Sequence, residues 1–195
     1  MRQLTLAATL ALCTLAFAAD NPPADGKWID LFDGKTLDGW KVIGCQAEVQ
    51  DGAIFLKAGN GVVRTEKKYA DYTVEWECKA LKDDNWDSGV YFRCIDPAGS
   101  YPWPRKYQVN MRKGMEGNCD ELKGAKSTGL AKDHEWNRFK LTVVGAKAEL
   151  EINGKPAWKA DGVTEREGFI SIQAEVPGGG QYLYRNIRLM ELKSR

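Results

Sequence analysis

Three stretches of the sequence combine an apolar face with a face of large hydrogen-bonding side chains. Residues 72–80, 88–95 and 106–112 alternate in this way along their length. Successive side chains of a β-strand point to opposite faces, so each stretch predicts a strand with one apolar face and one polar face. The polar faces contain Glu75, Glu77, Tyr91, Arg93, Gln108, Asn110 and Arg112.

This set of side chains suits the recognition of sugars. Carboxylates, amides and guanidinium groups bind hydroxyl groups in pairs, and an aromatic ring packs against the apolar face of a pyranose. The competing interpretation is a solvated face with cross-strand ion pairs, such as one between Glu77 and Arg93. Both interpretations require the strands to be neighbours.

A hairpin would make the first two strands neighbours. If residues 72–80 and 88–95 turn near residues 85–87, then Glu77 lies close to Arg93 on the polar face. The same register brings Cys78 close to Cys94 on the apolar face, together with Val90 and Phe92.

The rest of the chain has the same strand-rich character. No long amphipathic helix is evident, and turn signals separate the short β-prone segments, with Asn153-Gly154 the strongest hairpin signal. This pattern predicts an all-β sandwich. The predicted strands are 28–31, 40–43, 46–50, 53–57, 61–64, 71–80, 88–95, 106–112, 136–144, 147–153, 156–159, 167–175 and 181–193.

Several segments resemble one known family. Residues 28–40, WIDLFDGKTLDGW, closely resemble the opening of the 3-keto-disaccharide hydrolase family, formerly a domain of unknown function. Ser88-Gly89 with Phe92-Arg93, Tyr107-Gln108-Val109 and Tyr184-Arg185-Asn186-Ile187 are similar to later motifs of that family. The resemblance spans nearly the whole chain after the N-terminal segment.

The resemblance implies a fold and an activity. The fold is a concanavalin A-like jelly-roll sandwich of two antiparallel sheets, with a sugar site on the concave face. The activity is cleavage of glycosides whose 3-hydroxyl group has been oxidised to a ketone. A 3-ketone acidifies the hydrogen on C2, so the reaction needs one base, one acid and a group that stabilises the enolate.

Roles for individual residues follow from the resemblance. Glu77 is the expected general base or acid, and Arg93 is expected to orient it or hold the enolate oxygen. Gln108 and Gln173 are expected to bind substrate hydroxyls. The faces described above add Glu75, Tyr91 and Asn110 as substrate-binding neighbours, and Trp103 is expected to offer a stacking surface at the rim.

The chain departs from the family pattern at three polar positions. Lys106 stands where many relatives have a carboxylate, Asn110 where they have an aspartate, and Glu175 where a histidine often follows the glutamine. These departures leave an alternative open, a non-catalytic carbohydrate-binding module that uses the same face. A scaffold or interaction domain is a third possibility.

The sequence predicts no metal site and no cofactor. Residues 83–89 place oxygen ligands at alternating positions, but Ser88 and Cys94 occupy the positions where an EF-hand loop requires glycine and glutamate. His134 is the single histidine, so histidine-based metal sites and catalytic triads are not expected. The polar loop 114–129 could supply an acid through Asp120 or Glu121, or it could be held by Cys119.

Four cysteines follow the N-terminal segment: Cys45, Cys78, Cys94 and Cys119. An even number permits two disulfides in an exported protein, and their spacing lacks the paired rhythm of a zinc site. Structural disulfides and buried thiols both fit this pattern.

The net charge of the sequence limits the class of ligand that the protein is expected to bind. The sequence has 28 basic and 27 acidic residues, which argues against a nucleic-acid surface because such a surface needs a basic excess. No membrane span is predicted. A carbohydrate or an oxidised glycoside is the expected ligand.

The N-terminus has the features of a secretory signal peptide. Arg2 precedes an apolar run from Leu4 to Phe17, and Ala16-Phe17-Ala18 provides small residues at the cleavage site. We therefore predict export to the periplasm or the medium, with cleavage after Ala18. The predicted organisation is a signal peptide at 1–18, a flexible lead-in at 19–27 and one domain at 28–195.

Overall fold

The computed structural model describes residues 26–127 and 129–193, and every regular element in them is a β-strand. The predicted signal peptide and most of the predicted lead-in lie outside this described part. No helix in the described part is long and apolar enough to cross a membrane. The strands are β1 (Trp28–Asp30), β2 (Trp40–Gln50), β3 (Ala53–Thr65), β4 (Tyr72–Ala80), β5 (Gly89–Cys94), β6 (Gln108–Asn110), β7 (Asn137–Val144), β8 (Lys147–Ile152), β9 (Lys155–Asp161), β10 (Phe169–Val176) and β11 (Tyr182–Glu191).

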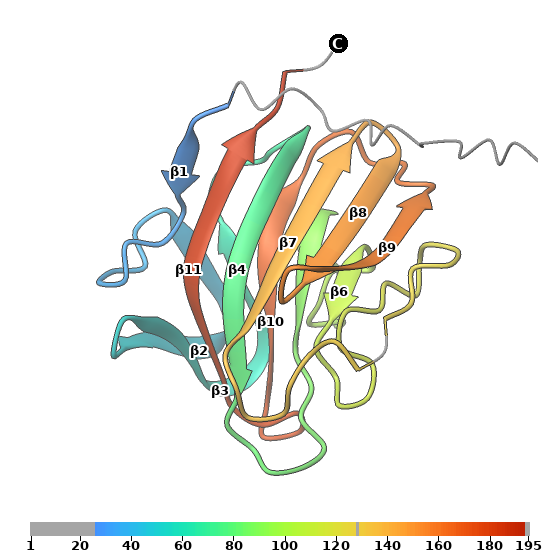
Figure 1. Ribbon diagram of the computed structural model, residues 1–195. Helices are drawn as coiled ribbons and strands as arrows, with labels where there is room; N and C mark the ends of the chain where they lie inside the picture. The colour runs from blue at the N-terminus through green and yellow to red at the C-terminus, as the bar shows by residue number, and fades with distance from the viewer. Residues whose placement is uncertain (1–25, 128, 194–195) are drawn as a thin grey trace, which may run out of the picture.

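The strands form two layers, and all of their pairings are antiparallel. The front layer has the strand order β1-β11-β4-β7-β8-β9, and the back layer has the order β6-β5-β10-β3. In Figure 1 the front layer faces the viewer, and β10, β5 and β6 lie behind it. The predicted all-β sandwich of antiparallel sheets is confirmed.

The hairpin of β2 and β3 connects the layers. The first part of β3 pairs with β11 through Ile54 and Phe55, and residues 59–64 pair with β10. The register between β2 and β3 shifts near Gly44, where Cβ atoms at Gly44 or Gly61 would collide with the opposing backbone. These bulges bend the hairpin. They also explain why the predicted strands 40–43 and 46–50 form one strand, β2, and why 53–57 and 61–64 form one strand, β3.

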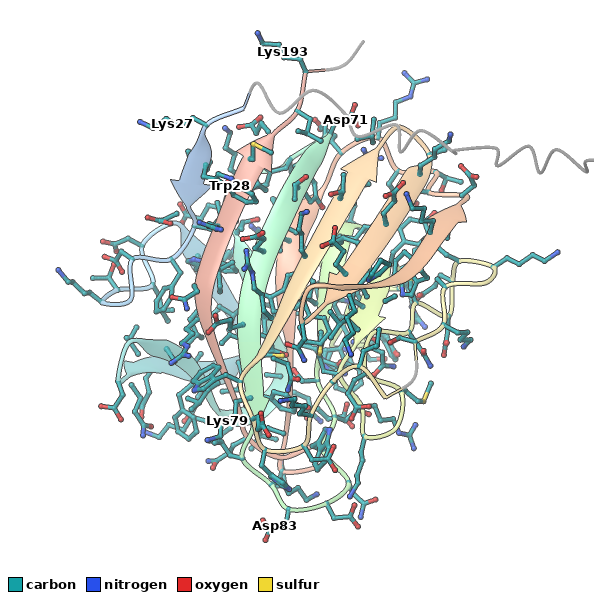
Figure 2. The ribbon with its side chains drawn as sticks, viewed as in Figure 1. Lys27, Trp28, Asp71, Lys79, Asp83 and Lys193 are labelled. Carbon is teal, nitrogen blue, oxygen red and sulfur yellow. The ribbon has the colours of Figure 1, made fainter. Side chains whose placement is uncertain are left out.

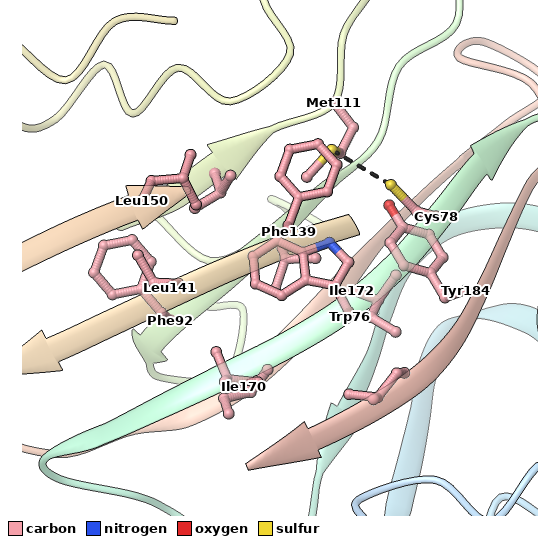
Figure 3. Close-up of a cluster of buried hydrophobic side chains, with 14 of the residues drawn as sticks. Trp76, Cys78, Phe92, Met111, Phe139, Leu141, Leu150, Ile170, Ile172 and Tyr184 are labelled. Atoms are coloured by element: carbon pink, nitrogen blue, oxygen red, sulfur yellow. Dashed lines mark hydrogen bonds between the residues drawn. The ribbon is translucent and has the colours of Figure 1, made fainter. Parts of the chain in front are cut away.

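The apolar faces of the two layers pack against each other. The front layer contributes Trp76 and Phe139, whose stacked rings lie 5.3 Å apart between centroids. The back layer contributes Phe92, Ile170 and Ile172, among other side chains. Figure 3 shows part of this buried cluster. The predicted apolar faces of residues 72–80 and 106–112 are therefore confirmed.

The four cysteines are thiols. Cys78 is buried with its Sγ 3.7 Å from Sδ of Met111, and Cys94 contacts Ser171 on another strand. Burial raises the pKa of Cys45 to about 11 and that of Cys94 to about 12. Of the two interpretations of the cysteine pattern, the structure has thiols, with Cys78, Cys94 and Cys119 buried and Cys45 half-buried.

The predicted hairpin between residues 72–80 and 88–95 is wrong. β4 pairs with β11 and β7 in the front layer, whereas β5 pairs with β10 and β6 in the back layer. The segment 81–88 therefore passes from one layer to the other instead of closing a hairpin. Cys78 and Cys94 are not neighbours, and neither are Glu77 and Arg93.

Candidate active site

The predicted polar face is divided between opposite sides of the molecule. Glu75 and Glu77 point outward from the front layer, whereas Tyr91, Gln108 and Gln173 point outward from the back layer. The two groups cannot contact one substrate, because both layers and the core lie between them. The expectation of one shared polar surface was wrong, because β4 and β5 belong to different layers.

The front-layer carboxylates are ion-paired. Both oxygens of Glu75 accept hydrogen bonds at 2.8 Å from Arg138, and Arg188 donates to the same carboxylate. Glu77 accepts a hydrogen bond at 2.8 Å from Arg185. Burial alone would raise the pKa of Glu75, but the hydrogen bonds from both arginines hold it below its ordinary value. Glu75 and Glu77 therefore form the kind of cross-strand ion pairs that the competing interpretation described.

Arg93 has a position that strand alternation does not predict. Phe92 and Arg93 together oppose one residue of β10, because Tyr91 pairs with Ser171 and Cys94 with Phe169. This bulge, with a φ of +46° at Arg93, reverses the alternation, so Cys94 takes the outer face and Arg93 turns inward.

The Arg93 side chain is 1 % exposed and is hydrogen-bonded through all three of its nitrogens. Its guanidinium group donates to the carbonyl oxygens of Ala70, Gly145 and Glu165 and to the carboxylate of Asp71. Asp71 lies at the upper end of β4 in Figure 2, and Lys79 lies near the lower end. Arg93 thus connects the two layers at the upper end of the sandwich, with its side chain turned away from the outer face of the back layer.

The outer face of the back layer carries a chain of amide hydrogen bonds. The side-chain amide of Gln108 donates to the oxygen of Gln173, and the amide of Gln173 donates to Glu175 at 2.9 Å. Gly89 lies beneath Gln108, and a Cβ atom there would occupy the space of the Gln108 amide. Gly89 therefore allows Gln108 to lie flat across β5 toward β10.

Aromatic side chains continue this face. Tyr91 is 4 % exposed, and no group in the described part of the chain hydrogen-bonds its hydroxyl. Burial raises the pKa of Tyr91 above its ordinary value, with further contributions from Tyr101 and Glu121. The indole N–H of Trp103 donates to the carbonyl of Ala174 at 3.0 Å, which fixes the segment around Trp103 over β10.

An open cleft of about 420 Å³ lies at the end of this face. Its lining contains two carboxylates, Asp87 and Glu175, and one guanidinium group, Arg112. Nε of Arg112 lies 4.0 Å from Oδ2 of Asp87. Asn110 accepts a hydrogen bond at 2.6 Å from the backbone N–H of Arg112, so it shapes the turn that presents this arginine.

A glycine turn and a buried serine hold the two carboxylates in place. The N–H of Asp87 donates to Gly179, and the N–H of Gly179 donates to the carbonyl of Glu175. A Cβ atom at Gly179 would collide with Asp87, so this contact requires glycine. Ser88 follows Asp87 and is buried, and its hydroxyl lies 2.6 Å from the carbonyl oxygen of Gln173. This contact fixes the chain beside Asp87.

The pKa of Asp87 is raised from 3.8 to about 6. Burial is the larger cause, and the negative charge of Glu175 is the second. Like charges in one cleft resist ionising together, so Asp87 keeps its proton up to about pH 6. An acid and a base can therefore act at the same place.

Sequence reasoning did not assign a role to Asp87 or Glu175. Asp87 appeared only as part of a polar loop, and Glu175 only as a departure from the family pattern. The sequence did contain a signal that Glu175 lies on the polar face. It follows Gln173 by two positions, and residues two apart on a strand point to the same face. In the described part of the chain, no three His, Cys, Asp or Glu side chains gather to hold a metal ion. Asp120 of the long loop is ion-paired with Lys126.

Comparison with known proteins agrees with this architecture. The family described as the 3-keto-alpha-glucoside-1,2-lyase-like domain matches residues 27–190. No curated protein matches the sequence.

Solved structures share the fold at low sequence identity. A candidate glycosyl hydrolase from Parabacteroides distasonis is 20% identical, with 85% of this chain and 100% of that chain covered and a TM-score of 0.66. A Bacillus subtilis protein with a galectin-like fold is 14% identical, with 87% and 96% covered and a TM-score of 0.60. The carbohydrate-binding module CBM66 from Bacillus subtilis is 12% identical, with 77% and 94% covered and a TM-score of 0.57. The predicted jelly-roll fold is confirmed.

Replacing Arg93 is expected to destabilise the protein. Arg93→Met should lower the free energy of unfolding in urea by about 3–5 kcal/mol, because three carbonyl groups lose a buried donor. Arg112→Met is the matched control. Its side chain is 63% exposed, so a change within about 0.5 kcal/mol is expected. Equal losses in both variants would contradict the structural role of Arg93.

Asp87→Asn is expected to stabilise the protein at neutral pH. A carboxyl group whose pKa is higher in the folded than in the unfolded protein stabilises the fold while it is protonated. This contribution is complete below pH 3.8 and is lost as the pH rises through about 6. The side chain is 24% exposed, so at pH 7.5 the variant should gain roughly 1–2 kcal/mol over the wild type. Near pH 3.5 the two proteins should differ little. Urea unfolding at both pH values measures this, and a constant difference would contradict the raised pKa.

Proposed function

Because the chain belongs to the 3-keto-alpha-glucoside-1,2-lyase-like domain family, we propose that it cleaves 3-keto-glycosides in the cleft of Asp87 and Glu175. The observation that carries this proposal is the pair of carboxylates in one cleft, one of them with a pKa near 6. The similarity to a candidate glycosyl hydrolase and to a carbohydrate-binding module supports a carbohydrate ligand.

The first half of the proposed reaction is an elimination. A base removes the proton on C2, and the electron pair of that bond moves toward the C3 ketone to form an enolate. The enolate then expels the substituent on C1, and an acid protonates the departing oxygen. The C2–H and C1–O bonds break, and a C1=C2 double bond forms beside the restored ketone.

The second half adds water. The group that acted as acid is now ionised and removes a proton from water as the oxygen attacks C1. The group that acted as base returns its proton to C2. The sum is hydrolysis of the glycosidic bond, and both carboxyl groups recover their starting protonation states.

The geometry suggests which carboxyl group has which role. Gln173 donates a hydrogen bond to Glu175, which orients that carboxylate for the role of base. The raised pKa of Asp87 suits the role of acid. Arg112 lies beside Asp87 and can hold the enolate oxygen. Gln108 and Tyr91, farther along the same face, can bind hydroxyl groups of the substrate.

Glu77, the base expected from the resemblance, has a different environment. It lies on the outer face of the front layer and is ion-paired with Arg185. Arg93, its expected partner, is buried between the layers at one end. The proposed reaction therefore uses neither residue.

Two variants test the assignment with two kinds of leaving group. Glu175→Gln should lower kcat/KM by about 10²–10⁴ for both a 4-nitrophenyl 3-keto-glucoside and a 3-keto-disaccharide, because both need the base. Asp87→Asn should cause a loss of that size only for the disaccharide, because nitrophenolate leaves without protonation. Wild-type activity on the disaccharide should also fall as the pH rises above about 6, where Asp87 loses its proton.

Glu77→Gln distinguishes this proposal from the assignment based on the resemblance. We expect that variant to keep full activity. A loss of activity would place the catalytic residues on the front layer instead. Absence of turnover with every 3-keto substrate would overturn the proposed function. Sugar binding without turnover would then favour the non-catalytic carbohydrate-binding alternative.

We further propose that the protein is exported, on the basis of the N-terminal sequence. Expression of the full chain in a bacterial host should yield a secreted or periplasmic protein that begins at Ala19. N-terminal sequencing after cell fractionation measures this. A cytoplasmic protein that retains Arg2 would contradict export.

A further inference from the structure

A second hollow lies on the outer face of the front layer, on the opposite side of the sandwich from the Asp87 cleft. Its volume is about 300 Å³, and its lining includes Glu75, Glu77, Arg138 and Arg188. It lies over the central strands β11, β4 and β7, which hold its side chains on a rigid surface.

The buried carboxylate of Glu75 fixes two of the arginines. The Glu75 side chain is 6% exposed, whereas Arg138 and Arg188 are 53% and 42% exposed. Each guanidinium group donates to Glu75 with part of its N–H groups and leaves the rest facing outward. In the described part of the chain, nothing accepts from Nε and Nη1 of Arg138 or from Nη1 of Arg188.

Two tryptophans hold arginines at the sides of this hollow. The guanidinium carbon of Arg185 lies 3.8 Å from the ring centroid of Trp136, and that of Arg188 lies 4.6 Å from the ring centroid of Trp28. Figure 2 shows Trp28 on β1, next to β11. Stacking on an indole ring restricts a guanidinium plane, so its free N–H groups point in fixed directions.

The remainder of the same face is built differently. Lys140 pairs with Glu151, and Lys159 pairs with Glu149, through side chains that are 38–65% exposed. These lysine pairs have no stacked aromatic ring, and they are the ordinary solvated ion pairs of an exposed sheet. The combination of arginine and tryptophan occurs on this face only around the hollow, within the residues that the structure describes.

Charge balance indicates the class of ligand. Arg138, Arg188 and the carboxylates of Asp30, Glu75 and Glu77 line the hollow. Arg185 pairs with Glu77 at its side, so three guanidinium groups balance three carboxylates. The net charge of the hollow is therefore zero, which favours neither an anion nor a cation. Rigid, outward-facing N–H donors on a neutral surface suit vicinal hydroxyl groups.

We propose that this hollow is a second carbohydrate-binding site, one that takes a neutral oligosaccharide and is separate from the Asp87 cleft. The site does not depend on the proposed catalytic function, because it shares no residue with the cleft. An oligosaccharide anchored here would keep the protein near its glycan without occupying the catalytic cleft.

Site-resolved NMR on the full chain tests the proposal. Maltohexaose and cellohexaose, both unoxidised, are titrated to roughly 10 mM, and the indole N–H signals of Trp28 and Trp136 are followed after assignment with Trp→Phe variants. Saturable movement of these signals with at least one sugar is expected. Failure of both signals to move with either sugar would overturn the proposal.

Matched variants then locate the binding. Arg185→Lys keeps the positive charge but loses the planar donor group, so the affinity that these signals report should fall by about tenfold. Lys159→Ala removes a lysine pair on the same face and should leave the affinity unchanged. Glu175→Gln changes the catalytic cleft and should also leave it unchanged. Unchanged affinity in Arg185→Lys, or a loss equally large in Glu175→Gln, would overturn the assignment.

Discussion

The two layers are held together by the burial of one apolar face from each of them. Once Trp76 and Phe139 pack against Phe92 and Ile172, the alternate side chains of every strand must point away from the core. The two polar faces therefore look in opposite directions. Two separate surfaces result, an ion-paired one over β4 and an amide-rich one over β5 and β10.

The single extra residue in β5 has a large effect because strand alternation has a period of two. The bulge at Arg93 moves a charged side chain from the outer face into the space between the layers. There it satisfies three carbonyl groups and Asp71, so a cation that would be costly to bury alone becomes a connection between the layers. The same residue loses its access to a ligand on the outer face.

The cleft owes its chemistry to tertiary contacts between distant segments. Asp87 follows β4 by seven residues and Glu175 lies near the end of β10, yet a glycine turn holds them in one poorly solvated place. Burial and the negative charge of Glu175 then raise the pKa of Asp87, as a general acid requires. The front-layer hollow shows the reverse case, in which hydrogen bonds from Arg138 and Arg188 outweigh burial and lower the pKa of Glu75, while the guanidinium groups keep free N–H donors that face outward.

Local patterns in the sequence were enough to predict the fold class, most of the strands, and which side chains of β4 and β6 are buried, because alternation and turn residues are local signals. It also placed Gln108, Asn110 and Tyr91 on one polar face. It could not decide which strands are neighbours, because the segment 81–88 fits a hairpin and a crossing between layers equally well. The packing of the two layers places Glu77 and Arg93 apart and brings Asp87 and Glu175 into one cleft. Such pairings depend on burial of the whole apolar surface, which no short stretch of sequence contains.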